Sequence, residues 1–429
     1  MALTLLLSGR IAGRLEADGN GNPRLRYADT WLNTAGAYAV SLSLPLTQAD
    51  FPPQAVSAVL WGLLPDNESL LQRWGTRFHV SPRNPVALLS HVGEDCAGAV
   101  QFVSDERLED VLSGRDDQIE PLDDAELADR LRRLRQDNGM ARNVDDVGQF
   151  SLAGAQSKIA LLRQDDGSWA IPAGRVPTTH ILKPPGGDYD GFVENEMFCL
   201  RLAQALGLPA ATVEKIDIGG ETAICVSRYD RARTNGNLVR VHQEDFCQAL
   251  GVMPQIKYQS QGGPGPADLA KILWDHSSQP RTDVETLFQA LAFNYLIGGT
   301  DAHAKNYSLL FGAGGNVRLA PLYDISSALP YPHLQKRKIK MAMKIGSHYR
   351  WWDIRPEDWQ ETATSMQLNP ALALQILSVM CLMLPDTAQQ AQQQLLSEGI
   401  EHPVLDLLVQ EIRFSCERCI RKLQTTPAS

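Results

Sequence analysis

Apolar and polar positions follow different patterns in successive parts of the 429-residue chain. Residues 1 to about 103 alternate short apolar runs with turns that contain glycine or proline, and 52–74 has the spacing of a helix. These features predict a small mixed α/β domain. Residues 104–124 are rich in acidic side chains, and we interpret them as a surface connection.

The leucines of 123–137 recur at helical spacing, and Asp123 or Asp124 can cap the start of this helix. Beyond residue 150 the apolar runs become short and predict strands at 158–162, 169–172 and 179–183. A helix is expected over 193–208, followed by a hairpin across Gly219-Gly220. After about residue 242 the periodicity is mainly helical.

The change from a strand-rich to a helical pattern indicates two lobes after the N-terminal part, and such an arrangement places a ligand cleft at the junction. We therefore predict three domains: an N-terminal subdomain over 1–145, a strand-rich lobe over 146–241 and a helical lobe over 242–429.

Composition narrows the class of protein. Apolar residues make up 44% and charged residues 21% of the chain, which is typical of a globular protein. The net charge of −10 argues against a nucleic-acid footprint over the whole molecule. The apolar runs are shorter than the roughly 18 residues that span a bilayer. We expect a cytoplasmic protein with no membrane partner.

Cysteine usage agrees with that expectation. Seven cysteines, an odd number scattered over a long chain, are typical of reduced thiols. Cys416 and Cys419 form a C-x-x-C pair with no second pair nearby, so a zinc site is not predicted.

The segment "GTDAHAKN" places polar side chains between two apolar stretches. Asp301 and Asn306 have the spacing of the catalytic loop of protein kinases, in which a carboxylate accepts the substrate's hydroxyl proton and an asparagine holds Mg²⁺. His303 and Lys305 lie between them and can contact phosphate or brace the loop. Asp324, eighteen residues after Asn306, has the position of a second metal-binding aspartate.

Three further features precede this loop in kinase order. The small residues of 151–158 let backbone N–H groups approach a phosphate, and Lys158 adds a charge. Lys183 closes an apolar strand, where kinases place the lysine that contacts ATP phosphates. Glu196 on the next helix is its expected ion-pair partner, with Glu194 as the alternative. Each feature is ordinary alone, but their order favours a kinase fold.

The residues also resemble a known family. The chain is similar to the HipA family of serine/threonine kinases, the toxins of HipA–HipB systems, in "SLAGAQSKIALL", "PTTHILKPP", "NEMFCLRLAQALGL", "QEDFCQALG", "KYQSQGGPG", "GGTDAHAKNYS" and "LAPLYDI". The resemblance covers nearly the whole chain. It implies an α+β, bilobal protein-kinase-like fold with an extra N-terminal mixed α/β subdomain and an all-helical C-terminal lobe.

The resemblance also implies site roles. Asp301 would be the catalytic base, and Asn306 and Asp324 would hold Mg²⁺. Residues expected to bind ATP are Ala153, Gly154, Ala155, Gln156, Ser157, Lys158, Lys183, Ser227, Arg228, Tyr229, His303, Ala304, Lys305, Asn306, Tyr323 and Asp324. Among these, 227–229 would form the adenine hinge through backbone groups. Ser151 would be autophosphorylated, with Ser157 as the alternative acceptor.

The implied partners are a HipB-like helix-turn-helix antitoxin and a protein substrate, either a translation factor or an aminoacyl-tRNA synthetase such as glutamyl-tRNA synthetase. Residues 347–354 do not follow the lysine-rich stretch with which one branch contacts DNA, so operator DNA is expected only indirectly through the antitoxin. Two alternatives stay open. One is a catalytically silent, ATP-binding co-repressor, and the other is a metal-dependent hydrolase that uses Asp301, His303 and Asp324.

Overall fold

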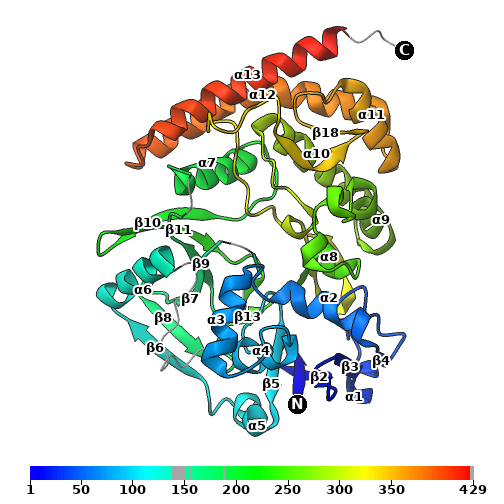
Figure 1. The fold of residues 1–429 in the computed structure, drawn as a ribbon, viewed down its shortest axis with the longest axis vertical. Helices are drawn as coiled ribbons and strands as arrows, with labels where there is room; N and C mark the ends of the chain where they lie inside the picture. The colour runs from blue at the N-terminus through cyan, green and yellow to red at the C-terminus, as the bar shows by residue number, and fades with distance from the viewer. Residues whose placement is uncertain (138–150, 152, 155, 187–188, 426–429) are drawn as a thin grey trace. The chain divides into compact units, whose positions relative to one another are not determined.

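The structure is a computed structural model, and it describes residues 1–425 except 138–150, 152, 155 and 187–188 (Figure 1). The chain forms two compact units. The first contains Met1–Pro184, Ile216–Gln255 and Leu309–Val317, and the second contains Pro185–Lys215, Ile256–Ser308 and Arg318–Ser429.

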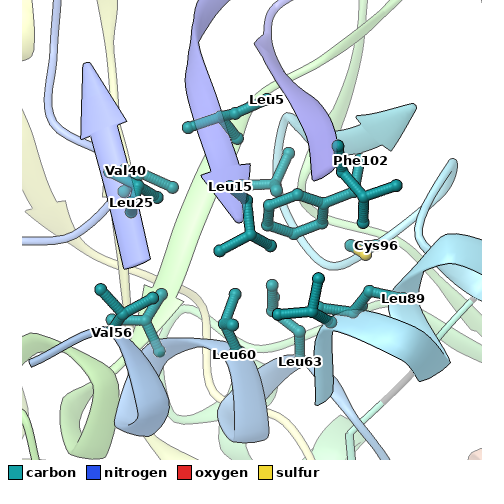
Figure 2. Close-up of a cluster of buried hydrophobic side chains, with 14 of the residues drawn as sticks. Leu5, Leu15, Leu25, Val40, Val56, Leu60, Leu63, Leu89, Cys96 and Phe102 are labelled. Atoms are coloured by element: carbon teal, nitrogen blue, oxygen red, sulfur yellow. The ribbon is translucent and has the colours of Figure 1, made fainter. Parts of the chain in front are cut away.

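The N-terminal part of the first unit is built on a five-stranded sheet in the order β4-β3-β2-β1-β5, with all neighbours antiparallel. Its strands are β1 (Ala2–Leu7), β2 (Arg10–Ala17), β3 (Pro23–Tyr27), β4 (Asp50–Phe51) and β5 (Val100–Ser104). The accompanying helices are α1 (Asp29–Leu32), α2 (Pro53–Leu63), α3 (Glu68–Phe78) and α4 (Pro85–Val92). Figure 2 shows how α2 and α4 bury Leu60 and Leu89 against Leu15 and Phe102 of the sheet.

A six-stranded sheet in the order β10-β11-β9-β7-β8-β6 follows. Its strands are β6 (Gln118–Leu122), β7 (Ile159–Arg163), β8 (Trp169–Ala173), β9 (His180–Lys183), β10 (Val213–Ile218) and β11 (Glu221–Ser227). Helix α6 (Asp124–Asp137) packs its leucines against this sheet, in one core with Leu161 and Leu182. Asp123 caps α6, because its Oδ1 accepts the Glu126 N–H at 2.8 Å. The predicted strands, helix and hairpin are thus confirmed.

The first unit ends with smaller elements: β12 (Arg231–Thr234), β13 (Asn237–Arg240), β14 (His242–Asp245), α8 (Phe246–Ala249) and most of β15 (Ser308–Phe311). The second unit is mainly helical. It contains α7 (Phe192–Ala205), α9 (Pro266–His276), α10 (Pro280–Ile297), α11 (Pro356–Ser365), α12 (Pro370–Ser397) and α13 (Pro403–Thr425). Strands β16 (Val317–Leu319), β17 (Lys340–Ile345) and β18 (His348–Arg350) complete the chain.

Helix α12 lies side by side with α13 in the second unit and also packs on α7, α10 and α11 (Figure 1). Although no continuous apolar run is of spanning length, α12 is long and apolar enough to cross a membrane by length and composition, with a mean hydropathy of 1.6 over 18 residues. A core helix passes the same test. One third of the residues in that window are buried, and Leu377 and Leu384 are among the buried side chains of the helix.

Two sequence interpretations were wrong in detail. The acidic stretch 104–124 is not a surface connection, because it forms α5 (Asp105–Ser113) and the edge strand β6. An edge strand exposes most of its side chains, so its composition resembled a loop. The single helix expected over 52–74 is two helices, since Pro65 follows the end of α2 and Asn67 caps α3.

The predicted α+β fold class, with an N-terminal sheet and a helical C-terminal region, is confirmed. The helical region additionally contains the β17–β18 hairpin. The predicted boundary between residues 145 and 146 lies outside the described residues, and the three-domain division stays a prediction.

Candidate active site

The loop that contains Asp301 begins where α10 ends. Gly298 adopts φ 68° there, a left-handed conformation that favours glycine. The Asp301 carbonyl accepts two hydrogen bonds, from the His303 N–H at 2.8 Å and from Asn306 Nδ2 at 2.9 Å. The Asn306 N–H donates to the His303 carbonyl at 2.9 Å. The loop is therefore folded on itself, and it holds Asp301 and Asn306 together.

The residues between Asp301 and Asn306 differ in exposure. Asp301 is exposed, whereas His303, Ala304 and Lys305 are buried. Tyr323 donates its hydroxyl hydrogen to the Lys305 carbonyl at 2.6 Å. Of the two roles left open for His303 and Lys305, this burial favours bracing of the loop.

Asp324 comes from a segment further along the chain and lies on the same cavity as Asn306. The backbone of Leu322 bonds Pro209 and Ala211 on either side, each at 2.8 Å, and fixes the approach to Asp324. Asp324 itself adopts φ 56°, which is uncommon for a residue with a side chain, although aspartate tolerates it better than most.

One small cavity in the second unit is lined by both predicted metal ligands. Its lining residues are Asn294, Ala302, Asn306, Tyr307, Leu322, Tyr323, Asp324 and Ile325. An amide oxygen and a carboxylate on one cavity fit Mg²⁺, which binds few protein oxygens and leaves room for phosphate and water. Among the described residues, no group of three or more His, Cys, Asp or Glu side chains is placed to hold a metal.

The candidate phosphate loop lies in the first unit, and Leu152 and Ala155 of this loop fall outside the described residues. Lys158 Nζ donates to the Ala153 carbonyl at 2.8 Å. Gly154 has φ 108°, and a Cβ there would lie 2.5 Å from Lys158 Nζ. Gln156 and Ser157 are half-buried. The loop thus closes around the Lys158 ammonium, and Gly154 is required for that shape.

Ser151, the expected phosphate acceptor, is completely buried. Its Oγ donates to the Leu63 carbonyl at 2.7 Å, and its N–H donates to the Asp95 carbonyl at 3.1 Å. The Gly154 carbonyl accepts the Asp66 N–H at 3.2 Å. The phosphate loop is therefore attached to the end of α2 and the turn that follows it.

Lys183 and Glu196 lie on the strand and the helix that were predicted for them. Lys183 is the last residue of β9 and is buried opposite Ile224 of β11. Glu196 is buried on α7. The alternative, Glu194, forms an ion pair with Lys215 at 3.3 Å, which favours Glu196. Lys183 belongs to the first unit and Glu196 to the second, so their pairing stays a prediction.

The predicted hinge follows β11. Ser227 ends the strand, and the Arg228 N–H donates to the Thr179 carbonyl at 2.9 Å. The Tyr229 hydroxyl bonds the side chain of Gln243. The Arg228 guanidinium instead contacts Asp230 at 2.8 Å, inside the unit. The Arg228 side chain is thus engaged inside the unit, and recognition of adenine by the backbone of 227–229 stays a prediction.

Sequence reasoning missed the buried ionic cluster around Arg228. Asp95 contacts Arg231 at 2.9 Å and Arg240 at 3.1 Å. Burial alone would raise the pKa of Asp95, but Arg231, Arg240 and Arg228 outweigh it and hold this pKa below its ordinary value. Burial and the adjacent Arg228 lower the pKa of Arg231 to about 10, so it stays charged at neutral pH.

Comparison with known proteins decides the family. Residues 150–388 match the HipA-like C-terminal domain, and residues 3–103 match the HipA N-terminal domain. The chain belongs to the HipA family. Like other members it is a serine/threonine protein kinase, of the class found in toxin–antitoxin systems, and its phosphate donor is ATP.

HipA-family relatives match over most of their length. The chain is 40% identical over 364 residues to the putative kinase Y4mE of Sinorhizobium fredii, covering 84% of each protein. It is 29% identical over 367 residues to the serine/threonine-protein kinase toxin HipA of Shewanella oneidensis, covering 81% of this chain and 79% of that one. The solved Shewanella HipA, in complex with HipB and operator DNA, has the same fold with a TM-score of 0.82, 24% identity and 98% coverage of both chains.

Proposed function

We propose that this HipA-family kinase transfers the γ-phosphate of ATP, with Mg²⁺, to a serine or threonine hydroxyl, and that it acts as the toxin of a type II toxin–antitoxin pair in a bacterial cytoplasm. The observation that carries the proposal is the second-unit cavity. Asn306 and Asp324 line it together, and Asn306 also bonds the Asp301 backbone.

In the proposed reaction, the acceptor oxygen forms a bond to the γ-phosphorus as the bond to the ADP oxygen breaks. The acceptor proton passes to the Asp301 carboxylate, which is exposed and so reachable by a protein substrate. Asn306 and Asp324 would hold Mg²⁺, which neutralises phosphate charge when bound. Lys183 and 153–158 would contact the ATP phosphates, and the backbone of 227–229 would receive adenine.

Asp301→Asn tests the proposal directly. The wild type, incubated with ATP and Mg²⁺, should gain phosphate in intact-mass spectra, while Asp301→Asn should lose transfer by at least about 100-fold because a general base contributes that much. ATP affinity, measured with a fluorescent analogue, should stay within about twofold. A wild type that carries no phosphate when purified and gains none on incubation would contradict the kinase proposal.

The same measurement distinguishes an active kinase from the alternative, a catalytically silent co-repressor. That protein would bind ATP without transfer, so the wild type and Asp301→Asn would behave alike. The intact positions Lys183, Asp301, Asn306 and Asp324 favour transfer.

We further propose that Ser151 is the autophosphorylation site, with Ser157 as the alternative. A phosphoserine adds a charge of roughly −1.5 to −2 next to the ATP phosphates and would disfavour the closed loop. Because Ser151 is buried, the loop has to open before modification. Phosphopeptide mapping of Ser151→Ala and Ser157→Ala decides between the two acceptors.

The proposed protein substrate is a translation component such as glutamyl-tRNA synthetase, and the proposed partner is a HipB-like antitoxin that would connect the chain to operator DNA. The solved Shewanella homologue supports the partner, since that HipA is bound to HipB and operator DNA. Phosphoproteomics after induction would identify the substrate, and copurification with a small helix-turn-helix protein encoded next to the gene would identify the partner.

A further inference from the structure

Tyr258 contacts the candidate base directly. Its hydroxyl donates to Asp301 Oδ1 at 2.5 Å, and both residues belong to the second unit. Tyr258 lies 43 positions before Asp301 and belongs to none of the predicted site residues. A hydrogen bond this short to a carboxylate belongs to the stronger class, because the acceptor carries a charge.

The loop that presents Tyr258 is tightly built. The Tyr258 carbonyl accepts the N–H groups of Gln261 and Gly263, at 2.9 and 3.0 Å. The neighbouring Gln259 accepts the Lys344 N–H of β17 through its Oε1 at 2.7 Å. A Cβ on Gly263 would lie 2.1 Å from the Ile256 carbonyl oxygen, so only glycine fits this turn. Tyr258 is therefore held by its own backbone and by an adjacent strand.

A residue of the Asp301 loop, His303, also orients the Tyr258 ring. The tyrosine ring meets the His303 ring edge-on, with centroids 5.0 Å apart and an interplanar angle of 89°. His303 is buried and belongs to the same loop as Asp301. The ring and the hydroxyl of Tyr258 thus contact one loop at two points, which fixes where the hydroxyl points.

We propose that Tyr258 is a positioning residue for the kinase reaction: its hydroxyl holds the Asp301 carboxylate, through Oδ1, in the orientation in which that carboxylate accepts the proton of the substrate hydroxyl. This inference rests on the proposed role of Asp301 as the base. A carboxylate has about four acceptor positions on its two oxygens, and the Tyr258 hydroxyl fills one of them.

A rival explanation is that the Tyr258 hydroxyl occupies the place of the substrate hydroxyl and so inhibits phosphate transfer. The two explanations predict opposite signs. Removing a positioning hydroxyl lowers the maximal rate, because the base is no longer held in its reactive geometry. Removing a blocking hydroxyl raises that rate.

The test is Tyr258→Phe, which removes the hydroxyl and keeps the ring against His303. The initial rate of ADP formation by the full-length chain is measured as a function of ATP concentration. ADP is the chosen readout because it forms whichever acceptor receives the phosphate. We expect kcat to fall about 10-fold, the amount that one charge-assisted hydrogen bond typically controls. The KM for ATP should stay within about twofold, and the melting temperature should be unchanged. An unchanged melting temperature shows that the fall in kcat does not come from a loss of folded structure.

Tyr331→Phe is the matched control. Tyr331 is also in the second unit, and its hydroxyl accepts a hydrogen bond from Asn195 Nδ2 at 3.2 Å, away from Asp301. This variant should keep the wild-type kcat. An unchanged or raised kcat in Tyr258→Phe, with an active wild type, overturns the positioning role alone. A wild type that forms no ADP overturns the proposed kinase function instead.

Discussion

Replacing Glu244 with glutamine should change how stability depends on pH. Glu244 lies on β14 and is 2% exposed, and its Oε1 accepts the Leu42 N–H at 2.8 Å. Burial raises the pKa of this carboxyl from 4.5 to about 8, even though the hydrogen bonds from Ser41 and Leu42 lower it. Glutamine has a similar shape and keeps an oxygen acceptor for Leu42, but it cannot ionise.

The sign follows from proton binding. Between pH 4.5 and 8 the folded chain keeps the Glu244 proton while the unfolded chain loses it, so the free energy of unfolding falls as pH rises through this window. At 1.36 kcal/mol for each pH unit, the full difference is worth about 5 kcal/mol. Between pH 6 and pH 8 the free energy of unfolding falls by about 3 kcal/mol through Glu244. Above the pKa of the folded state, Glu244 causes no further fall.

The assay is urea denaturation of both proteins at pH 6 and pH 9, followed by tryptophan fluorescence. Glu244→Gln should gain about 3 kcal/mol relative to the wild type between these two pH values. Glu109→Gln is the control, because the Glu109 side chain is 88% exposed and should give no such gain. An equal stability difference between Glu244→Gln and the wild type at both pH values would refute the reasoning.

Two further changes test the first unit. Asp95→Asn should lower the free energy of unfolding by roughly 3–5 kcal/mol, because it removes the buried carboxylate that Arg231 and Arg240 share. Urea curves measure this change, and Asp165→Asn, at an exposed partner of Arg233, is the control that should change little. Gly154→Ala should weaken ATP binding about 10-fold in a fluorescence titration, because alanine at φ 108° distorts the loop. Gly167→Ala, at φ 87° in open space, should keep wild-type affinity, and equal losses in the two would contradict the loop argument.

Local patterns were predictable from the sequence because the forces that set them act within a few residues. The spacing of apolar residues predicted β7, β9 and α7 at nearly their observed bounds. The association of Asp301 with Asn306 was predictable for the same reason, since it is made by hydrogen bonds within one loop.

Contacts between distant segments were not predictable. Asp95 and Arg228 are 133 positions apart, and nothing in the motif around Arg228 indicates that its guanidinium contacts Asp95. Asp324 lines the cavity two positions after Leu322, whose backbone bonds Pro209 and Ala211, and only tertiary structure creates these bonds. The sequence contained one signal for Tyr258, a single aromatic residue before the glycines of "KYQSQGGPG", but the target of its hydroxyl was not visible.

The burial of Ser151 connects the N-terminal part to the proposed autophosphorylation. Among the described residues, opening the loop breaks three hydrogen bonds: two from Ser151, to Leu63 and Asp95, and one from the Asp66 N–H to the Gly154 carbonyl. At about 1 kcal/mol each, these bonds cost about 3 kcal/mol together, which leaves about one chain in a hundred open. If Ser151 is the acceptor, this cost slows its modification, and a change that weakens the hydrogen bonds to the turn at 63–66 should speed it.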